Sequence, residues 1–456
     1  MGRKSLQSGK ATLAAAIVII PVALPLVGAG GLLRAEEGIS ASFTISERLE
    51  NVQRQGFSNN ENEGFRSVTR LGFGLLSENQ NQALSFNTGT DFVYNFSRSE
   101  TEFEDPDLNL NYDLQTRNAG LSFDASYVRR DVEDSVFFDD LSNEFIISDD
   151  GRREIFSLRS ALSLNRQGPI TFDLNHFFSD SRFTGTTDPD LRDSTTNGLT
   201  ASSSFRLSPV ASLNATARWR EQDQDGVGAN DRTRTSFDVG GTYDISAVTT
   251  LSAGISYFNN ESTTRTDNSG PGYRFGLSHD RPNGTYDFDI SSRETINGNE
   301  VDARANRSYD LPRGTASIGF GLAKVEGFSI EPLISAGLNL DINNVSRISL
   351  DLSQASTVDN DDNETIRTRL SVSYSRELNE ISSMSASFRF ADENVLADND
   401  EDTTSLRASL SYRRAVGDDW SLVSGYEYST NQRNDREDRN SNTLFVSLEK
   451  AFSFRP

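Results

Sequence analysis

Apolar and polar residues alternate along almost the whole chain, from about residue 39 to residue 454. In one run Leu84 and Phe86 alternate with Ser85 and Asn87, and similar runs recur throughout. Each run lasts about ten residues, the length that a tilted strand needs to cross the hydrocarbon layer of a membrane and about twice that of an ordinary strand. Helical spacing, with apolar residues at i, i+3 and i+4, is essentially absent. The pattern predicts an all-β chain of membrane-length strands.

The segments between these runs are alternately short and long. The short ones hold turn-forming residues, as in Pro282-Asn283-Gly284. Tight turns at one end and long loops at the other are typical of bacterial outer-membrane barrels. We expect a single antiparallel up-and-down transmembrane β-barrel over residues 36–456, with about 22 strands. The number would be 20 if the weak strand near 303–310 and one neighbour were absent. Both termini are expected on the periplasmic side, where the turns are short. The long connections are 98–107, 131–151, 184–195, 222–232, 259–271, 391–403 and 431–441.

Composition fits such a barrel and excludes several other classes of protein. The 456 residues include no Cys and carry a formal net charge of -23. The lack of Cys excludes disulfide frameworks, Cys-based zinc sites and thiol catalysis. The negative charge argues against binding to nucleic acid, which needs a basic patch. The mean hydropathy of -0.53 is low, but a barrel tolerates this because polar lumen residues dilute the lipid-facing ones.

Residues 1–35 have the features of a secretory signal peptide. Basic residues precede a long apolar stretch, small residues follow it, and cleavage is expected after Ala35 or Ala29. An uncleaved membrane anchor is the alternative, but Pro21 and Pro25 within the apolar stretch argue against it. Because the first alternating run starts within a few residues of these sites, we expect no plug domain, although 22-stranded outer-membrane transporters usually hold one in the lumen.

Charged residues in the alternating runs fall on the face opposite to the large apolar side chains. An arginine at the midplane of the lipid face of a barrel costs about 2–4 kcal/mol, so we expect the charged face to point into the lumen. The other residues of this face are mostly small and polar, and they leave room for water in a wide barrel. The expected pore-lining residues are Asp91, Asp113, Asp124 and Asp173 from early strands, and Arg206, Arg218, Arg293, Arg367, Arg369, Arg389, Arg407 and Arg413 from later ones.

Two features of the expected lumen leave alternatives open. The early acidic residues and the late arginines would either set up a transverse field across the pore or pair with lumen neighbours and stiffen the wall. The loop 131–151 carries apolar triplets on both sides of Asp140-Leu141-Ser142-Asn143. It would either form an apolar hairpin above the membrane, which we favour, or fold inward and narrow the pore.

Catalytic or metal-binding chemistry has little support in the sequence. The only histidines are His176 and His279, and counting by twos places both on the lipid side, so we do not expect an enzyme. The acidic run from Asp359 to Glu364 has oxygen ligands at calcium-like density, but it lacks the glycine and the spacing of an EF-hand loop. We interpret it as a solvated charge run and expect no cofactor. The alternative for the acidic loops is weak divalent-cation binding, with the cations bridging to lipopolysaccharide phosphates.

Over residues 39–456 the chain resembles the porin-like outer-membrane barrels of Gram-negative bacteria. The resemblance is one of pattern and includes a final alternating strand with Leu444, Val446 and Leu448, in which Phe454 takes the place of the usual terminal aromatic, two residues before the end. It implies that the C-terminal strand binds the barrel assembly machinery and that the barrel contacts outer-membrane lipid and lipopolysaccharide.

The function expected from these features is passive diffusion of small hydrophilic solutes or saccharides through the outer membrane. Two alternatives stay open. The barrel could anchor a surface protein whose acidic external loops serve adhesion or envelope structure, or it could be associated with exopolysaccharide export. A β-solenoid is disfavoured because the strands show no repeated residue signature.

Overall fold

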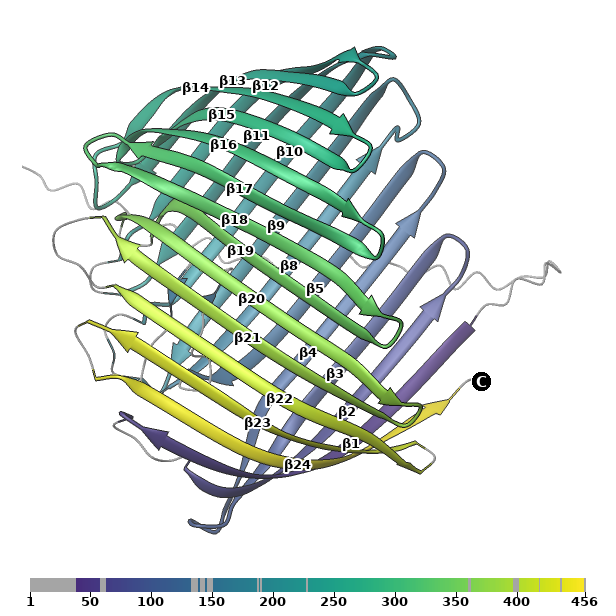
Figure 1. Ribbon diagram of the computed structural model, residues 1–456. Helices are drawn as coiled ribbons and strands as arrows, with labels where there is room; N and C mark the ends of the chain where they lie inside the picture. Colours follow the sequence, from purple (N-terminus) through teal and green to yellow (C-terminus); the bar gives the residue numbers. More distant parts are fainter. Residues whose placement is uncertain are drawn as a thin grey trace, which may run out of the picture. The chain divides into compact units, whose positions relative to one another are not determined.

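The computed structural model describes residues 38–57, 63–132, 138–139, 144–145, 151–186, 188, 191–226, 229–359, 362–396, 402–417, 419–434 and 437–454. Twenty-two strands form one antiparallel sheet (Figure 1). Strands β6 and β7 form a separate two-stranded sheet. In these ranges no helix is long and apolar enough to span a membrane. The strands are β1 (Gly38–Gln55), β2 (Gly64–Glu78), β3 (Gln82–Asn95), β4 (Glu100–Gln115), β5 (Ala119–Asp131), β6 (Phe138–Asp139), β7 (Glu144–Phe145), β8 (Arg152–Leu164), β9 (Ile170–Thr184), β10 (Ser194–Ser208), β11 (Ala211–Gln224), β12 (Arg232–Ser246), β13 (Thr249–Ser262), β14 (Asn268–Arg281), β15 (Gly284–Thr295), β16 (Gly298–Leu311), β17 (Gly314–Val325), β18 (Ile330–Asn343), β19 (Ser346–Val358), β20 (Glu364–Asn379), β21 (Ser382–Val395), β22 (Thr403–Gly417), β23 (Trp420–Arg433) and β24 (Arg439–Phe454).

The large sheet closes on itself, because β1 pairs with β2 on one side and with β24 on the other. At the closure Ala41 faces Phe454, and Gln55 faces Asn440. A closed sheet has no free edge, so every strand finds backbone partners on both sides, as a membrane interior requires. The prediction of a 22-stranded up-and-down barrel is therefore confirmed, and the strand expected near 303–310 lies inside β16.

Tight turns and longer connections lie at opposite ends of the barrel. Connections such as 209–210 and 312–313 hold two residues, whereas 185–193 at the other end holds nine. Both described ends of the chain, Gly38 and Phe454, belong to the tight-turn end, because β1 starts there and β24 finishes there. The alternation of connection lengths is as the sequence predicts, except for the two-residue connection 296–297 at the end of the longer connections. The two ends are called here the tight-turn end and the long-loop end.

One predicted long connection is wrong. The acidic segment 98–107 is mostly strand, since β3 extends to Asn95 and β4 begins at Glu100. A bulge at Asp105, with a φ of 46°, shifts the register between β3 and β4. Phe103 is the only large apolar side chain between Glu100 and Asp107, so this part of the strand lacks the apolar alternation by which the other strands are recognised.

The outer face carries the large apolar side chains. Ile255 on β13 is 72% exposed and Phe320 on β17 is 63% exposed, as expected for residues that meet lipid rather than protein. On β13 the residues in between are Ser252, Gly254 and Ser256, and their side of the sheet is the inner one. The strands thus separate a lipid-compatible face from a polar one.

Aromatic residues on the outer face contact the side chain of Arg307 near the tight-turn end. The register places Arg307 beside Tyr286, on the same face as the exposed Phe288. The Arg307 guanidinium lies 4.1 Å from the ring centre of Tyr286 and 4.6 Å from that of Tyr309, and its Nη2 donates to Oδ1 of Asn283 at 2.7 Å. Such cation–π contacts suit the headgroup depth of a membrane, where one end of a side chain is apolar and the other is wet.

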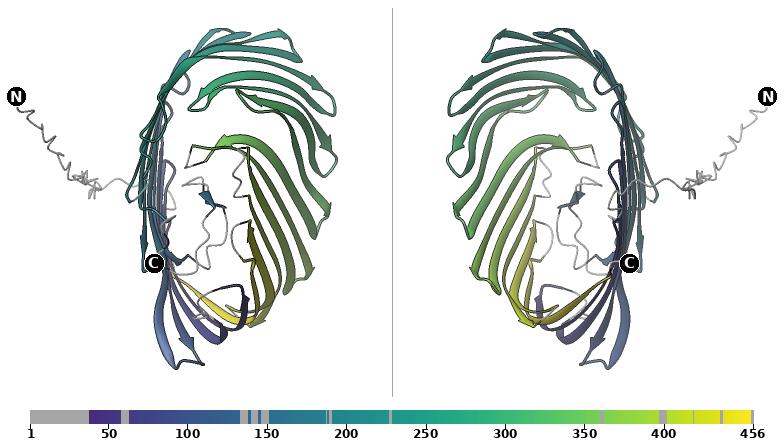
Figure 2. Two further views of the ribbon diagram at one scale, coloured as in Figure 1. Left: turned by 90° about the vertical axis from the view of Figure 1, so that its left-hand side faces the viewer. Right: turned by 90° about the vertical axis from the view of Figure 1, so that its right-hand side faces the viewer.

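The barrel wall has a seam between β18 and β19 at the long-loop end. Their pairing stops at Ser335 and Ser353, whereas β19 and β20 stay paired as far as Val358 and Glu364. Pro332 lies in the unpaired part of β18, and proline has no N–H to offer a neighbouring strand. The ends of β19 and β20 therefore leave the wall, and in Figure 2 this light-green hairpin turns into the interior of the barrel. We call residues 354–359 and 362–368 the mouth hairpin.

Candidate functional site: the charged inner wall and the mouth hairpin

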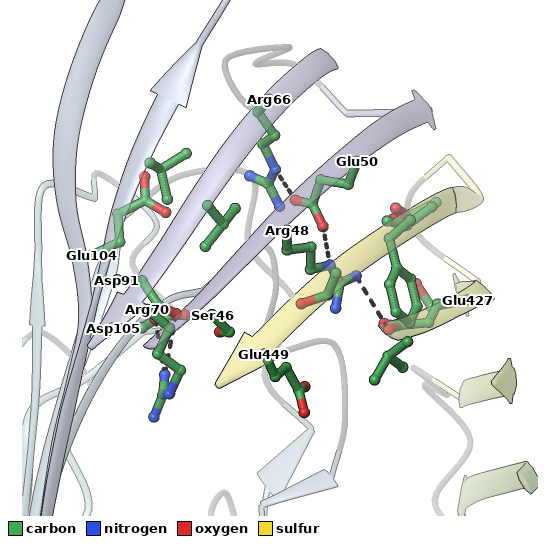
Figure 3. Close-up of a pocket in the computed structure, with 18 of the residues that line it drawn as sticks. Ser46, Arg48, Glu50, Arg66, Arg70, Asp91, Glu104, Asp105, Glu427 and Glu449 are labelled. Atoms are coloured by element: carbon green, nitrogen blue, oxygen red, sulfur yellow. Dashed lines mark hydrogen bonds and ion pairs between the residues drawn. The ribbon is translucent and has the colours of Figure 1, made fainter. Parts of the chain in front are cut away.

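The inner face of the barrel holds a cavity of about 440 Å³ where the sheet closes. Side chains from β1, β2 and β3 meet side chains from β22, β23 and β24 there, since closure makes the first and last strands neighbours. Half of the residues that line the cavity are charged, with groups of both signs (Figure 3). This wall is the first part of the candidate site.

A chain of ion pairs crosses the closure (Figure 3). Arg66 of β2 donates to Glu50 of β1, and Glu50 lies 2.6 Å from Arg48. Nη2 of Arg48 lies 3.3 Å from Oε1 of Glu427 on β23, so this contact reaches over β24. The Arg48 guanidinium lies 3.7 Å from the ring centre of Phe445 on β24. These contacts fix the inner surface of the closure from β2 to β23.

A second group of charges lies beside this chain. Nη1 of Arg70 on β2 lies 3.1 Å from Oδ1 of Asp91 on β3, and Nη2 of Arg70 contacts Asp107 on β4. Asp91 is one of the predicted pore-lining residues, whereas sequence reasoning missed Arg70. Counting by twos along β2 would have placed Arg70 on the inner face, but the partner depends on the register between strands, which the local pattern does not give.

Four of the predicted arginines form ion pairs with carboxylates near them on the sheet. Opposite charges so close cancel much of their field. The structure therefore favours the pairing interpretation of the lumen charges over a transverse field, and contact with a passing solute stays a prediction. The pairs are Arg218–Asp238 at 2.5 Å, Arg293–Glu300 at 2.6 Å, Arg367–Glu393 at 2.9 Å and Arg413–Glu449 at 2.7 Å.

The structure does not gather the remaining predicted residues into one site. Arg407 lines the closure cavity together with Asp91. Asp173 accepts a hydrogen bond from Ser163 at 2.6 Å, and the other residues are spread around the barrel wall. Their cross-strand neighbours in the register are Ser122 for Asp113, Arg159 for Asp124, Ser212 for Arg206, Ser353 for Arg369, and Arg407 for Arg389.

The acidic run 359–364 differs most from its prediction. It is not a solvated charge run, because the Asp362 side chain is only 1% exposed. Oδ1 of Asp362 lies 2.9 Å from Nη2 of Arg232 on β12. Its Oδ2 accepts hydrogen bonds from Asn230 at 2.8 Å, Ser262 at 2.7 Å and Thr264 at 3.0 Å. The carboxylate is therefore held by groups that lie about a hundred residues away in the sequence.

Glu364 is buried in the same region, with 1% of its surface exposed. Its Oε1 accepts hydrogen bonds from Thr295 at 3.0 Å and from Asn297 at 3.3 Å. Burial and the nearby charge of Glu300 raise the pKa of Glu364, while Arg293 opposes the shift. Burial of both carboxylates comes from long-range contacts, which is why the local sequence gave no signal for it.

Two further predicted features can be placed only in part. Of the loop 131–151, the pairs Phe138–Phe145 and Asp139–Glu144 form the short β6–β7 hairpin, which Figure 2 shows within the outline of the barrel; the rest of its apolar triplets lie outside the described residues, as does the signal peptide. Among the described residues, no group of three His, Asp or Glu side chains could hold a metal ion.

The two histidines lie on the outer face, where the sequence places them. His176 Nε2 is 3.0 Å from Asn197 Oδ1, and His279 Nδ1 is 2.9 Å from Thr249 Oγ1. Each partner belongs to the neighbouring strand. Both contacts join residues of adjacent strands, as an ordinary cross-strand pair does.

Comparison with known proteins identifies the fold. No family model and no curated protein matches the sequence. A mutant ferric enterobactin receptor of Pseudomonas aeruginosa, bound to enterobactin, is 11% identical, with a TM-score of 0.56 over 90% of this chain and 81% of its own. The ferric-catecholate import receptor of E. coli K12 is 9% identical, with a TM-score of 0.58 over 93% and 82%. The chain has the fold of a Gram-negative outer-membrane β-barrel.

Proposed function

We propose that the protein is a bacterial outer-membrane channel for the passive diffusion of small hydrophilic solutes or saccharides. The observation that carries the proposal is a serine lining on the inner face of β21 and β22, where Ser385 meets Ser411 and Ser387 meets Ser409, each pair at 2.7 Å. Side chains this short cannot fill the interior of a 22-stranded barrel. The space beside them is suited to water and to solutes that travel in it.

The charged wall at the closure supports hydrophilic rather than apolar cargo. Its cavity is bordered by Arg48, Arg70, Asp91 and Glu427, which can exchange hydrogen bonds with hydroxyl groups as well as with water. Because acids and bases alternate along this wall, a neutral polyhydroxylated solute such as a small sugar meets donors and acceptors without a large net field.

The setting in the membrane is part of the proposal. We place the tight-turn end, with both described chain ends and the Arg307–tyrosine cluster, on the periplasmic side. The long-loop end then faces outward toward lipopolysaccharide, where the acidic connections could hold divalent cations weakly. The last strand, which ends at Phe454, would bind the barrel assembly machinery.

Reconstitution tests the proposal directly. The refolded barrel is added to a planar bilayer for single-channel recording and to liposomes for swelling in sugars of graded size. Stepwise current and swelling in small sugars are expected. The similar solved structures are described as receptors, so the contrasting outcome is tight binding of one ligand with no steady current, which would replace the channel by a receptor.

A further inference from the structure

The mouth hairpin joins parts of the barrel that are far apart along the sheet. It arises from β19 and β20, yet its Asp362 contacts Asn230, in the connection between β11 and β12, 132 residues away. Asp362 also contacts Ser262 at the end of β13, 100 residues away, and Glu364 contacts Thr295 at the end of β15, 69 residues away. All these partners belong to the long-loop end. The hairpin therefore passes inside the wall and rests on the connections of β11 to β16.

The carboxylate at the far end of the hairpin is buried and has several polar partners. Asp362 has an arginine partner and three hydrogen-bond donors. Arg232, its ion-pair partner, is itself only 7% exposed. A buried charge without such partners is strongly unfavourable. Few other positions of the hairpin would therefore be as stable as this one. Asn297 adds a bond from its Nδ2 to the backbone carbonyl of Asp362 at 2.8 Å.

The near end of the hairpin is fixed by apolar packing and by the seam. Ile366 packs with Ala323 of β17 and Leu333 of β18 in a small buried cluster on the inner side of the wall. The Gln354 side chain accepts a hydrogen bond from the N–H of Ile334 at 3.2 Å and so satisfies one backbone donor that the seam leaves without a strand partner. Both ends of the hairpin are thus anchored, and the segment between them spans part of the mouth.

We propose that the mouth hairpin is a fixed bridge across the long-loop end of the pore, that it sets the upper size limit for solutes, and that the Asp362–Arg232 ion pair is its latch. The inference rests on the proposed channel function and adds the element that decides which solutes pass. A route beside the bridge is narrower than the full barrel, so loosening the latch enlarges the opening.

Substitution of Asp362 tests the latch. Asp362→Ala leaves Arg232 buried without its partner, so the hairpin should leave its seat, single-channel conductance should rise roughly twofold or more, and larger sugars should enter liposomes. Asp362→Asn keeps the shape of the side chain and removes the charge, so it serves if the alanine variant does not fold. Asp341→Asn is the matched control, because Asp341 pairs with Arg347 at 2.6 Å in an exposed position at the tight-turn end, and its pore should match the wild type.

A reversible lock gives the second arm of the test. The chain has no Cys, so a double variant with Asn230→Cys and Asp362→Cys carries only two thiols, placed on either side of a contact that now spans 2.8 Å. Without treatment this variant should resemble Asp362→Ala. A short, cleavable thiol-bridging reagent should restore the wild-type size limit, and cleavage of the bridge should abolish it again.

The outcomes separate the two proposals. A conducting wild type with unchanged size limits in folded Asp362→Ala, Asp362→Asn and the double variant would overturn the bridge and keep the channel. Current in Asp362→Ala alone would support a hairpin that obstructs the mouth and overturn an open wild-type channel. Absence of current in all variants would overturn both.

Discussion

The charged wall at the barrel closure and the latch of the mouth hairpin use the same residue types in different ways. At the closure Arg48 and Glu427 are 29% and 42% exposed, whereas Arg232 and Asp362 of the latch are 7% and 1% exposed. Exposed ion pairs contribute about 0–1 kcal/mol, but removal of one partner from a buried pair costs about 3–5 kcal/mol. The wall is therefore suited to contact solutes, and the latch is suited to fix a geometry.

The largest effect is expected from the basic partner of the latch. Arg232→Ala leaves Asp362 buried without its counter-charge and should destabilise the seated hairpin by about 3–5 kcal/mol. Hydrogen exchange of the amides of residues 354–359 and 362–368 measures this, and they should exchange far faster than in the wild type. Unchanged protection would show that the buried pair does not hold the hairpin and would remove the contrast with the wall.

An intermediate effect is expected where the closure itself contains a buried charge. Glu50 is 4% exposed and bonds to both Arg48 and Arg66. Glu50→Gln should lower the free energy of unfolding by about 1.5–3 kcal/mol, as for other hydrogen bonds to charged groups. Urea unfolding of the detergent-solubilised barrel provides the measurement. A loss below 0.5 kcal/mol, as at a typical surface site, would place Glu50 with the exposed pairs of the wall.

A smaller effect is expected from pH. The pKa of Glu364 is raised by burial, and then by Glu300, against the influence of Arg293, and Asp362 and Arg232 also carry charge in this cluster. The contribution of Glu364 to the stability of the seated hairpin is fully present below the ordinary glutamate pKa. This contribution is lost as the pH rises through the raised pKa of Glu364. Amide protection in the hairpin should therefore increase on acidification, and Glu364→Gln should reduce this dependence. The opposite slope would contradict the burial of an ionisable Glu364.

The smallest effect is expected at an exposed ion pair elsewhere on the inner face, between β11 and β12. Arg218 and Asp238 lie 2.5 Å apart with 52% and 21% of their side chains exposed. Arg218→Ala should change the free energy of unfolding by about 0–1 kcal/mol, while the ionic selectivity of the channel shifts toward cations because a positive lumen charge is lost. A loss of several kcal/mol would show that the exposed ion pairs of the inner face do not differ in kind from the buried latch.

Much of the fold could be predicted because the strands and turns of a membrane barrel are recognised from local sequence patterns. Ile255 and Ser256 fall on opposite faces for the reason that neighbouring side chains of a strand always do, and short turns of two to five residues, such as 312–313, form every second connection. The prediction for 98–107 was wrong because Phe103 is the only large apolar side chain of this segment, so the segment shows no apolar alternation.

The candidate site could be predicted only in part. Counting by twos along each strand placed Arg218 and Arg293 on the inner face. The identity of their partners, Asp238 and Glu300, depends on the register between strands and could not be predicted in this way. The mouth hairpin was missed for a stronger reason. Asp362 lies in a run that looks fully solvated, and it is buried through contacts with distant residues such as Arg232, 130 positions away along the chain.

Accessibility of single thiols on one strand tests the central claim most directly. Because the chain has no Cys, Ser256→Cys and Ile255→Cys each introduce one reporter on β13. In liposomes, a membrane-impermeant charged maleimide should label Ser256→Cys rapidly through a water-filled lumen and leave Ile255→Cys, in contact with lipid, unmodified. Labelling of Ile255→Cys, with Ser256→Cys protected, would contradict the assignment of the two faces and the channel that follows from it.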